Sequence, residues 1–234
     1  MFLKESVIIE FNGLPATGKT TIAGKLISIL AQHDISTRRQ YVKHAWQNNG
    51  RTVFLCFDCL KLFYKLCPFS LKIRPIRNRL THVMGEMYYF RTYRDFLQRK
   101  QAKEVLVIDQ GMIQSIISIA HLDKIEDLDG LNSILDFYSN RHIRFVRIDC
   151  KLDEELSCRR IQQRPQTSAR MYNLPTSDLL YAMQTQADNF RITRNLFYKF
   201  SICDNKIEID TKKTPIENSE IIFNYLCEKG YISK

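Results

Sequence analysis

The sequence has no uninterrupted apolar run of about twenty residues, the length that a membrane-spanning helix requires. Its longest apolar segment, residues 53–66, is interrupted by Asp58, Lys61 and Lys65. This spacing predicts an amphipathic helix with a wide apolar face. The main interpretation is that this face packs on the protein's own core. The alternatives are a membrane surface and a second subunit in a homodimer.

Glycine and proline are scarce as well, with 8 and 6 residues among 234. The chain has no internal repeat, no low-complexity tract and no obvious linker. Its length is sufficient for an α/β domain with an inserted helical region and a substantial core. We therefore expect a single domain that spans residues 1–234.

Cysteine is present, but it forms neither a disulfide framework nor a metal-binding set. The seven cysteines are an odd and scattered number, and residues 1–5 lack the pattern of a signal peptide. We therefore expect reduced thiols and a cytoplasmic location. Cys56 and Cys59 form one C-x-x-C pair, but no second pair and no close histidine pair completes a zinc site. Buried thiols on a helix are the predicted arrangement.

Acidic residues are outnumbered, with 25 Asp and Glu against 35 Lys and Arg and a net charge of +10. This excess favours an anionic ligand or partner. Between Lys65 and Lys103, ten basic residues accompany only two acids, and aromatic residues at positions 88, 89, 90, 93 and 96 flank Arg91 and Arg94. The cluster suits a flat base that carries a phosphate. A core helix with a solvated basic face is the alternative.

The most specific motif is a glycine-rich octet near the amino terminus. It matches G-x-x-x-x-G-K-[ST] and consists of Gly13, Leu14, Pro15, Ala16, Thr17, Gly18, Lys19 and Thr20. The glycines let successive backbone N–H groups turn towards phosphate oxygens. We expect Lys19 to reach the β- and γ-phosphates, Thr20 to ligate Mg²⁺ through its hydroxyl, and Thr21 to join the nucleotide-binding residues. The octet therefore predicts binding of ATP with Mg²⁺.

The elements around the octet occur in the order that such a site requires. Residues 6–11 read as a buried parallel strand, and Ile22, Leu26 and Leu30 recur at helical spacing after the octet. Four further strands are predicted at residues 37–42, 104–109, 143–148 and 206–210, and a last helix at residues 216–228. Helical patterns separate these strands, which predicts a parallel sheet with right-handed crossovers.

Two more features are placed to do chemistry. Asp109 ends the predicted third strand, at the carboxyl edge where ligands of open α/β sheets bind. We expect it to hold Mg²⁺ beside Thr20 or to orient an acceptor hydroxyl, and a helix N-cap is the alternative. Arg160 and Arg164 share a helix face ahead of a polar stretch typical of a lid, where they would stabilise the transferring phosphoryl group. Exposed arginines on a crossover helix are the alternative there.

Together these features resemble the thymidylate kinase and deoxynucleoside kinase superfamily of P-loop NTPases. The resemblance rests on the octet, on Asp109 and on the run from Cys158 to Arg164. It implies a three-layer α/β/α fold with five parallel strands in the order 2-3-1-4-5 and a helical insertion between strands 2 and 3. It also implies an acceptor site in residues 48–103, a lid at residues 156–175 whose arginines contact the transferring phosphoryl group, and adenine near residues 211–215.

The sequence departs from those families in two places. Gln110 follows Asp109 where the families have arginine, and residues 41–46 lack both the acid of deoxynucleoside kinases and the Arg-Glu-Pro of thymidylate kinases. Lys43 and His44 suit a phosphorylated or otherwise anionic acceptor, since a phosphate oxygen needs no strong base. The predicted reaction is transfer of the ATP γ-phosphoryl group to a nucleotide, a nucleoside or a similar anionic metabolite.

Two other functions stay open at this point. The basic charge is compatible with a nucleic-acid-associated ATPase or a polynucleotide end kinase, whose affinity would fall steeply with salt. A GTPase-type switch needs a D-x-x-G and an N-K-x-D after strands. The stretch from Asp127 to Gly130 fits the first only in letters, and the stretch from Asn205 to Glu208 lacks the final aspartate of the second.

Overall fold

The computed structural model describes residues 1–3, 5–40, 57–71, 79–98, 103–120, 124–163 and 174–233. The strands in these ranges are β1 (Phe2–Leu3), β2 (Val7–Asn12), β3 (Thr37–Gln40), β4 (Val105–Ile108), β5 (Phe145–Lys151), β6 (Cys203–Asp210) and β7 (Ile232–Ser233). The helices are α1 (Lys19–Gln32), α3 (Phe57–Leu71), α4 (Arg79–Leu97), α5 (Met112–Ala120), α6 (Leu128–Ser139), α7 (Glu154–Gln162), α8 (Thr176–Lys199) and α9 (Pro215–Glu228).

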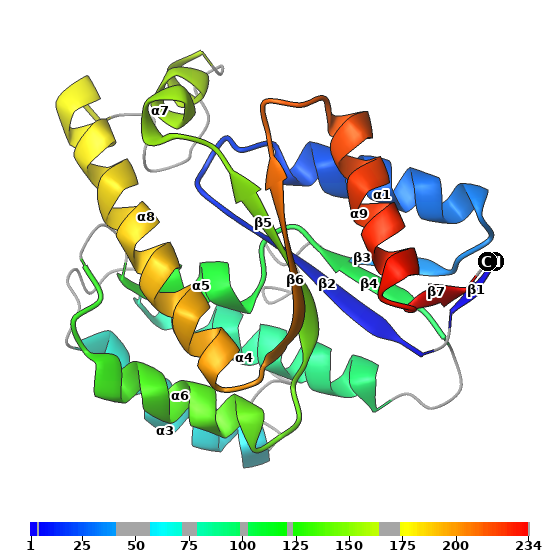
Figure 1. Ribbon diagram of the computed structural model, residues 1–234. Helices are drawn as coiled ribbons and strands as arrows, with labels where there is room; N and C mark the ends of the chain where they lie inside the picture. The colour runs from blue at the N-terminus through cyan, green and yellow to red at the C-terminus, as the bar shows by residue number, and fades with distance from the viewer. Residues whose placement is uncertain are drawn as a thin grey trace.

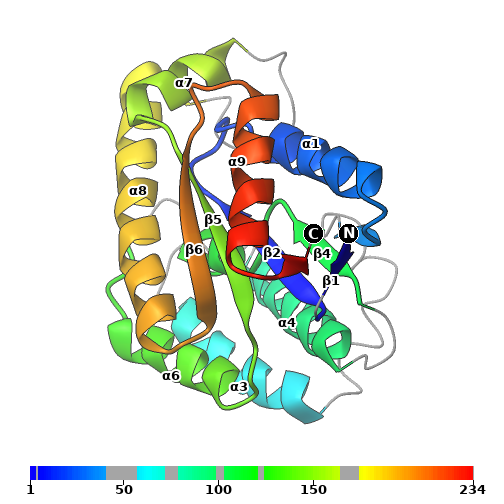
Figure 2. The same ribbon diagram turned by 45° about the vertical axis from the view of Figure 1, so that its right-hand side comes forward.

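Five strands form one parallel sheet in the order β3-β4-β2-β5-β6. Counted along the chain from β2, this is the order 2-3-1-4-5, which confirms the prediction. The strand that precedes the octet is therefore central, with β4 on one side and β5 on the other. The short strands β1 and β7 pair antiparallel and bring the two ends of the chain together, as Figure 2 shows.

Helices cover both faces of the sheet, so every residue of β2 is buried. On one face Val7, Ile9 and Phe11 share a hydrophobic cluster with residues of α1 and α9. On the other face Ile8 belongs to a larger cluster built with α3, α4, α5, α6 and α8. Figure 1 shows the two sets of helices on opposite sides of the sheet. The alternation along β2 thus places successive side chains in two different cores.

Several predicted bounds are wrong by a few residues. The strand expected at residues 143–148 occupies Phe145–Lys151, and the strand expected at residues 206–210 begins earlier, at Cys203. The reason is pairing between them, which continues to Lys151 opposite Asp210. Sequence alternation alone does not reveal how far a neighbouring strand extends the ladder.

The amphipathic helix expected at residues 53–66 is observed as α3, and residues 53–56 lie outside the described residues. Its buried face carries Cys59, Leu62 and Leu66, which pack in the core with α4 and α6. Cys59 is thus a buried thiol, as predicted, whereas Cys56 lies outside the described residues. Within the part of the chain that the structure describes, no helix is long and apolar enough to cross a membrane.

The aromatic residues of α4 belong to the core. Tyr89, Phe90, Tyr93 and Phe96 are all buried. These four rings are therefore not available as a stacking surface for a base, contrary to the prediction, and Tyr88, the fifth residue of the cluster, is partly buried and packs against the same core. Arg94, on the same helix, pairs with Asp58 of α3 at 3.3 Å between Nη1 and Oδ2. In the described part of the region, the alternative of a core helix with a solvated basic face is the better interpretation.

Candidate active site

The octet forms a tight loop between β2 and α1. Gly13 has φ 142° and Gly18 has φ 83°, conformations that residues with a side chain rarely adopt. A side chain at Gly13 would also place its Cβ 2.5 Å from the carbonyl oxygen of Cys150 on β5. Glycine is therefore required at the start of the loop both by its backbone angles and by the close approach of β5.

The tip of the loop is held by the helices that follow β5. Ala16 has φ 62°, a strained value for alanine that costs on the order of 1–3 kcal/mol. It packs in a small cluster with residues of α7 and α8. Ser157 of α7 donates its hydroxyl hydrogen to the carbonyl of Pro15. These contacts compensate the strain and keep the loop curled.

Lys19 is buried and folded back over the loop. Its Nζ lies 2.7 Å from the carbonyl oxygens of both Gly13 and Leu14 and 3.3 Å from the hydroxyl of Thr17. Among the described residues, no backbone carbonyl accepts the N–H groups of residues 16–18. N–H groups in a curled loop at a helix N-terminus are suited to bind phosphate oxygens.

Thr20 and Asp109 meet beside this loop, as the sequence predicts for a metal-binding pair. The Thr20 hydroxyl donates to Oδ2 of Asp109 at 2.8 Å, and Asp109 directly follows β4. Arg39 of β3 completes the group, with its Nη2 3.5 Å from Oδ2 of Asp109 and 3.0 Å from the carbonyl oxygen of Thr20. Thr21, the next residue of α1, is exposed and donates its N–H to the Gly18 carbonyl at 3.0 Å.

The pair fits Mg²⁺ by its chemistry. Mg²⁺ prefers hard oxygen ligands and usually takes one or two from the protein, with phosphate oxygens and water completing the shell. Thr20 and Asp109 would supply one hydroxyl and one carboxylate. No group of three or more His, Cys, Asp and Glu residues in the described ranges could enclose a metal ion. The arrangement therefore fits a metal that arrives with a nucleotide.

Of the two predicted lid arginines, the structure describes Arg160 and not Arg164. Arg160 lies on α7, and its Nη2 is 3.3 Å from the carbonyl oxygen of Thr211, in the loop after β6. That loop is the one that the resemblance places near adenine. Arg164 lies outside the described residues, as do Lys43 and His44 and the parts of the proposed acceptor and lid regions at residues 48–56, 72–78, 99–102 and 164–173.

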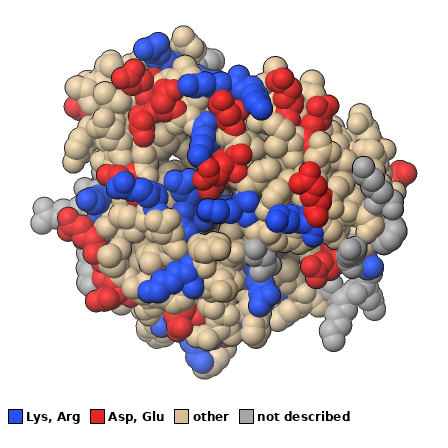
Figure 3. All heavy atoms as spheres, in the orientation of Figure 1, with Lys and Arg blue, Asp and Glu red and all other residues tan. Residues whose placement is uncertain are grey.

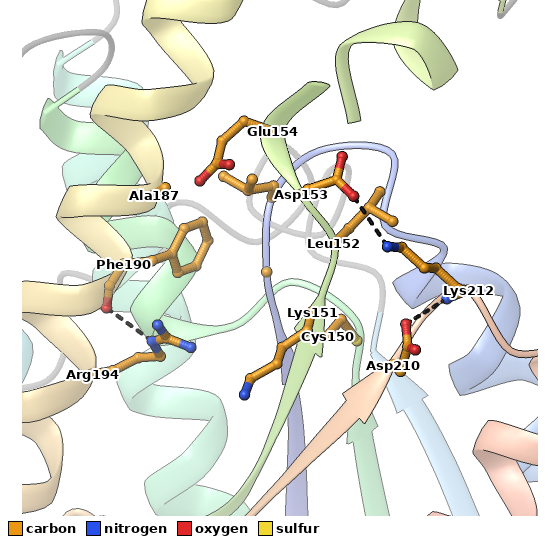
Figure 4. A pocket seen from close by; sticks show the side chains of 12 residues that line it. Cys150, Lys151, Leu152, Asp153, Glu154, Ala187, Phe190, Arg194, Asp210 and Lys212 are labelled. Atoms are coloured by element: carbon orange, nitrogen blue, oxygen red, sulfur yellow. Dashed lines mark hydrogen bonds and ion pairs between the residues drawn. The ribbon is translucent and has the colours of Figure 1, made fainter. Parts of the chain in front are cut away.

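A cavity of about 350 Å³ opens next to the start of the loop. Gly13 and Leu14 line it, together with the ends of β5 and β6 and one face of α8. Figure 4 shows Phe190 and Arg194 of α8 facing Lys151 of β5 across it. Gly13 and Leu14 are the only octet residues that line this cavity. The cavity therefore adjoins the start of the octet loop, whereas residues 15–20 lie outside its lining.

A buried charged network lies near this cavity. Asp149 of β5 is almost fully buried, with its Oδ2 3.1 Å from Nη2 of Arg147 and 3.5 Å from Nη1 of Arg194. Burial raises the pKa of the Asp149 carboxyl, and the two arginines act in the opposite direction. The sequence did not reveal this network, since residues 143–148 alternate apolar and basic side chains, a pattern that suggests a strand near one edge of the sheet.

The stretches that matched GTPase motifs in letters have structural roles. Asp127 caps α6 by accepting the N–H of Gly130 at 3.1 Å. Asn205 lies within β6 and donates to the hydroxyl of Tyr231 at 2.6 Å. Figure 3 shows acidic side chains interspersed among the basic ones on the face that carries β5, β6 and α8. Among the described residues, that face therefore shows no continuous basic surface of the kind typical of nucleic-acid binding.

Two residues at this site belong to no motif in the sequence. Arg39 is one of two basic residues in the predicted strand at residues 37–42, and only the pairing of β3 with β4 brings it to Asp109. Glu10 is a carboxylic acid in the middle of an apolar strand, and it lies fully buried behind the Asp109 turn. A charged residue at a position where both faces should be apolar is a signal that could have identified it.

Comparison with known proteins is informative at the level of structure. No protein-family model and no curated sequence matches the chain. A deoxyadenosine kinase from M. mycoides with dCMP and dCDP bound aligns over 95% of this chain and 100% of its own, with 15% identity and a TM-score of 0.51.

Two further alignments have a TM-score of 0.49. The same kinase with dATP shares 16% identity over 94% of this chain and 98% of its own. A shikimate kinase from Acinetobacter baumannii with shikimate shares 14% identity over 98% and 97%. The first alignment spans both chains almost completely and, together with the strand order and the phosphate loop, shows the fold. The chain has the fold of the P-loop kinases.

Proposed function

We propose that this protein is an ATP-dependent kinase that phosphorylates a small anionic metabolite. The observation that carries the proposal is the bond of 2.8 Å between Thr20 of the phosphate loop and Asp109 at the end of β4. It joins the two residues that would bind Mg²⁺ with ATP: Thr20 in the first turn of α1, which follows β2 through the loop, and Asp109 directly after the neighbouring strand β4. The deoxyadenosine kinase with a similar fold supports a small-molecule acceptor.

In the proposed reaction, the bond between the γ-phosphorus and the bridging oxygen of ATP breaks, and an acceptor oxygen forms the new bond. Lys19 would leave the carbonyls of Gly13 and Leu14 and neutralise the phosphate oxygens, since a phosphate offers its ammonium a stronger partner than a neutral carbonyl. Mg²⁺, when bound by Thr20 and Asp109, would neutralise negative charge on the transferring group.

Arg39 supports an anionic acceptor. Its guanidinium lies beside Asp109 at the end of the second strand of the sheet, close to the expected γ-phosphate. Arginine is suited to bind phosphate or carboxylate because its planar donors match two oxygens. An acceptor with a phosphate group would also need no strong base, which fits the absence of an acid in residues 41–46.

Release of ADP in the presence of candidate acceptors tests the proposal. We would incubate the protein and ATP·Mg with nucleosides, nucleoside monophosphates, sugar phosphates and an oligonucleotide with a free 5′-hydroxyl. We expect ADP with one anionic small molecule. Activity only with neutral nucleosides would refute the anionic acceptor, and activity only with the oligonucleotide would support the polynucleotide kinase instead.

Lys19→Ala should reduce this ADP release by at least about a hundredfold, because it removes the charge that meets the phosphates. Lys25→Ala is the matched control, since Lys25 is exposed on the same helix. It should leave both turnover and stability unchanged. Wild-type activity in Lys19→Ala would refute the role assigned to the loop.

A further inference from the structure

Glu10 is a buried carboxylic acid in the strand that enters the phosphate loop. Its relative exposure is 0%, and its carboxylate receives three hydrogen bonds. Oε2 accepts the hydroxyl of Tyr93 at 2.6 Å and the backbone N–H of Met112 at 3.1 Å, and Oε1 accepts the backbone N–H of Ile113 at 3.0 Å. An isolated buried carboxylate is costly, and these donors offset part of that cost.

Two of the three donors belong to the first turn of α5, which begins three residues after Asp109. The first N–H groups of a helix have no partner within the helix, so Glu10 satisfies two of them. The carboxylate thereby ties the start of α5 to β2. The turn that carries Asp109 therefore lies between two segments attached to β2: β4, which pairs with β2, and the start of α5, which bonds to Glu10.

The remaining residues of the turn are also held. A Cβ added to Gly111 would lie 2.2 Å from Cδ and 2.4 Å from Cγ of Glu10, so the Glu10 side chain fills the space that a larger residue would need. The Tyr89 hydroxyl donates to the carbonyl of Gln110. Gly111 therefore packs against this acid, and the backbone of Gln110, where the sequence departs from the families that it resembles, is held by Tyr89 of α4.

Both partners of the bond between Thr20 and Asp109 depend on β2. Thr20 follows β2 through the loop, and Asp109 follows β4, whose Ile108 pairs in register with Glu10. We propose that Glu10 is a positioning residue that holds Asp109 against Thr20 and thereby strengthens the binding of nucleotide with Mg²⁺. This inference rests on the proposed nucleotide site and does not depend on the identity of the acceptor.

Glu86 of α4 provides a matched comparison. It is equally buried and accepts the hydroxyl of Tyr138, so its replacement removes a similar buried acid from the same side of the sheet. Its hydrogen bonds that the structure describes do not involve residues 109–113. If Glu10 had a purely structural role, Glu10→Gln and Glu86→Gln would show the same amide exchange at Met112 and Ile113 and the same gain in ATP affinity from Mg²⁺.

The first measurement needs no nucleotide. Hydrogen exchange of the backbone amides of Met112 and Ile113 should accelerate at least about tenfold in Glu10→Gln, because glutamine turns an N–H group towards one of the two donors. It should be unchanged in Glu86→Gln. Equal exchange at these amides in both variants would refute the attachment of α5 through Glu10.

The second measurement compares the affinity for ATP with Mg²⁺ and with EDTA. Glu10→Gln should reduce the gain in affinity that Mg²⁺ provides by about tenfold or more, as is typical when a group that orients a metal ligand is lost. Affinity in EDTA should stay unchanged, and Glu86→Gln should retain the full gain. Tyr93→Phe, which removes one donor and keeps the carboxylate, should give a smaller loss in the same direction.

The two proposals fail in different ways. If wild-type protein gains ATP affinity with Mg²⁺ and Glu10→Gln keeps that gain, the positioning role is wrong and the kinase proposal is untouched. If no acceptor yields ADP while Glu10→Gln still loses the Mg²⁺ gain, the acceptor chemistry is wrong and the positioning role stands.

Discussion

Lys19 bonds to its own loop through the carbonyls of Gly13 and Leu14, at 2.7 Å each. These contacts keep an ammonium group satisfied at a position where it is 7% exposed. Phosphate binding would exchange two neutral acceptors for negatively charged ones, which attract the ammonium group more strongly. The Lys19 ammonium group thus already lies at the octet loop, where the proposed reaction requires it to contact the phosphates.

A second test at the scale of residues concerns Gly111. Gly111→Ala should lower the free energy of unfolding by about 1–3 kcal/mol, because the new methyl group overlaps the buried and tethered Glu10. Gly24→Ala is the control, since its added Cβ would make only an ordinary contact, 3.6 Å from Nη1 of Arg39. That substitution in the middle of α1 should stabilise by roughly 0.5–1 kcal/mol. Urea unfolding of both variants measures the difference, and equal midpoints would contradict the packing around Glu10.

At the scale of elements, α7 contacts both the octet loop and the loop that precedes α9. Ser157 and the cluster around Ala16 join α7 to the tip of the phosphate loop. Arg160 on the same helix reaches Thr211 in the loop before α9. The start of α9 therefore determines where this loop ends and how it meets α7.

The start of α9 is set by a capping box. The Thr214 hydroxyl accepts the N–H of Glu217 at 3.2 Å, and the Glu217 carboxylate accepts the N–H of Thr214 at 2.8 Å. Thr214→Ala should lower the free energy of unfolding by about 1 kcal/mol, because one helix N–H loses its acceptor. Thr214→Ser keeps the hydroxyl and should stay within a few tenths of wild type in the same thermal or urea unfolding experiment. If Thr214→Ser lowered the free energy of unfolding as much as Thr214→Ala, the threonine methyl group would contribute more to stability than the capping hydroxyl.

At the scale of the whole molecule, the buried acids make stability depend on pH. Burial raises the pKa of Glu10 to about 7 and that of Glu86 to about 8, from the ordinary glutamate value of 4.5. In the unfolded chain both groups lose their protons near that ordinary value. Between that pH and about 8, the folded protein therefore holds more protons than the unfolded chain.

The free energy of unfolding should consequently fall as pH rises from about 5 to about 8.5, by up to about 1.4 kcal/mol per pH unit for each proton retained. Glu86→Gln should show a shallower decline, since glutamine is neutral in both states. Urea unfolding at several pH values measures both slopes. Stability that rises through this range in wild type, or an unchanged slope in the variant, would contradict the raised pKa values.

Much of the fold was predictable because it depends on local patterns. The buried strand before the octet, the helix after it and the acid at the end of a strand each leave a signal within a few residues. The bounds of β5 and β6 were less predictable, since their pairing up to Lys151 and Asp210 is a contact between distant segments. The aromatic residues of α4 were misread for the same reason: composition shows that rings are present but does not show which way they face.

The sequence by itself determined the phosphate loop, because Gly13, Gly18, Lys19 and Thr20 impose the curl and supply the chemistry within eight neighbouring residues. Only the tertiary structure decided that Arg39 and Asp109 meet at this loop and that Glu10 holds the turn behind them. These contacts join residues up to 103 positions apart in the chain. They arise from the order of parallel strands, which places the carboxyl ends of β3, β4 and β2 side by side.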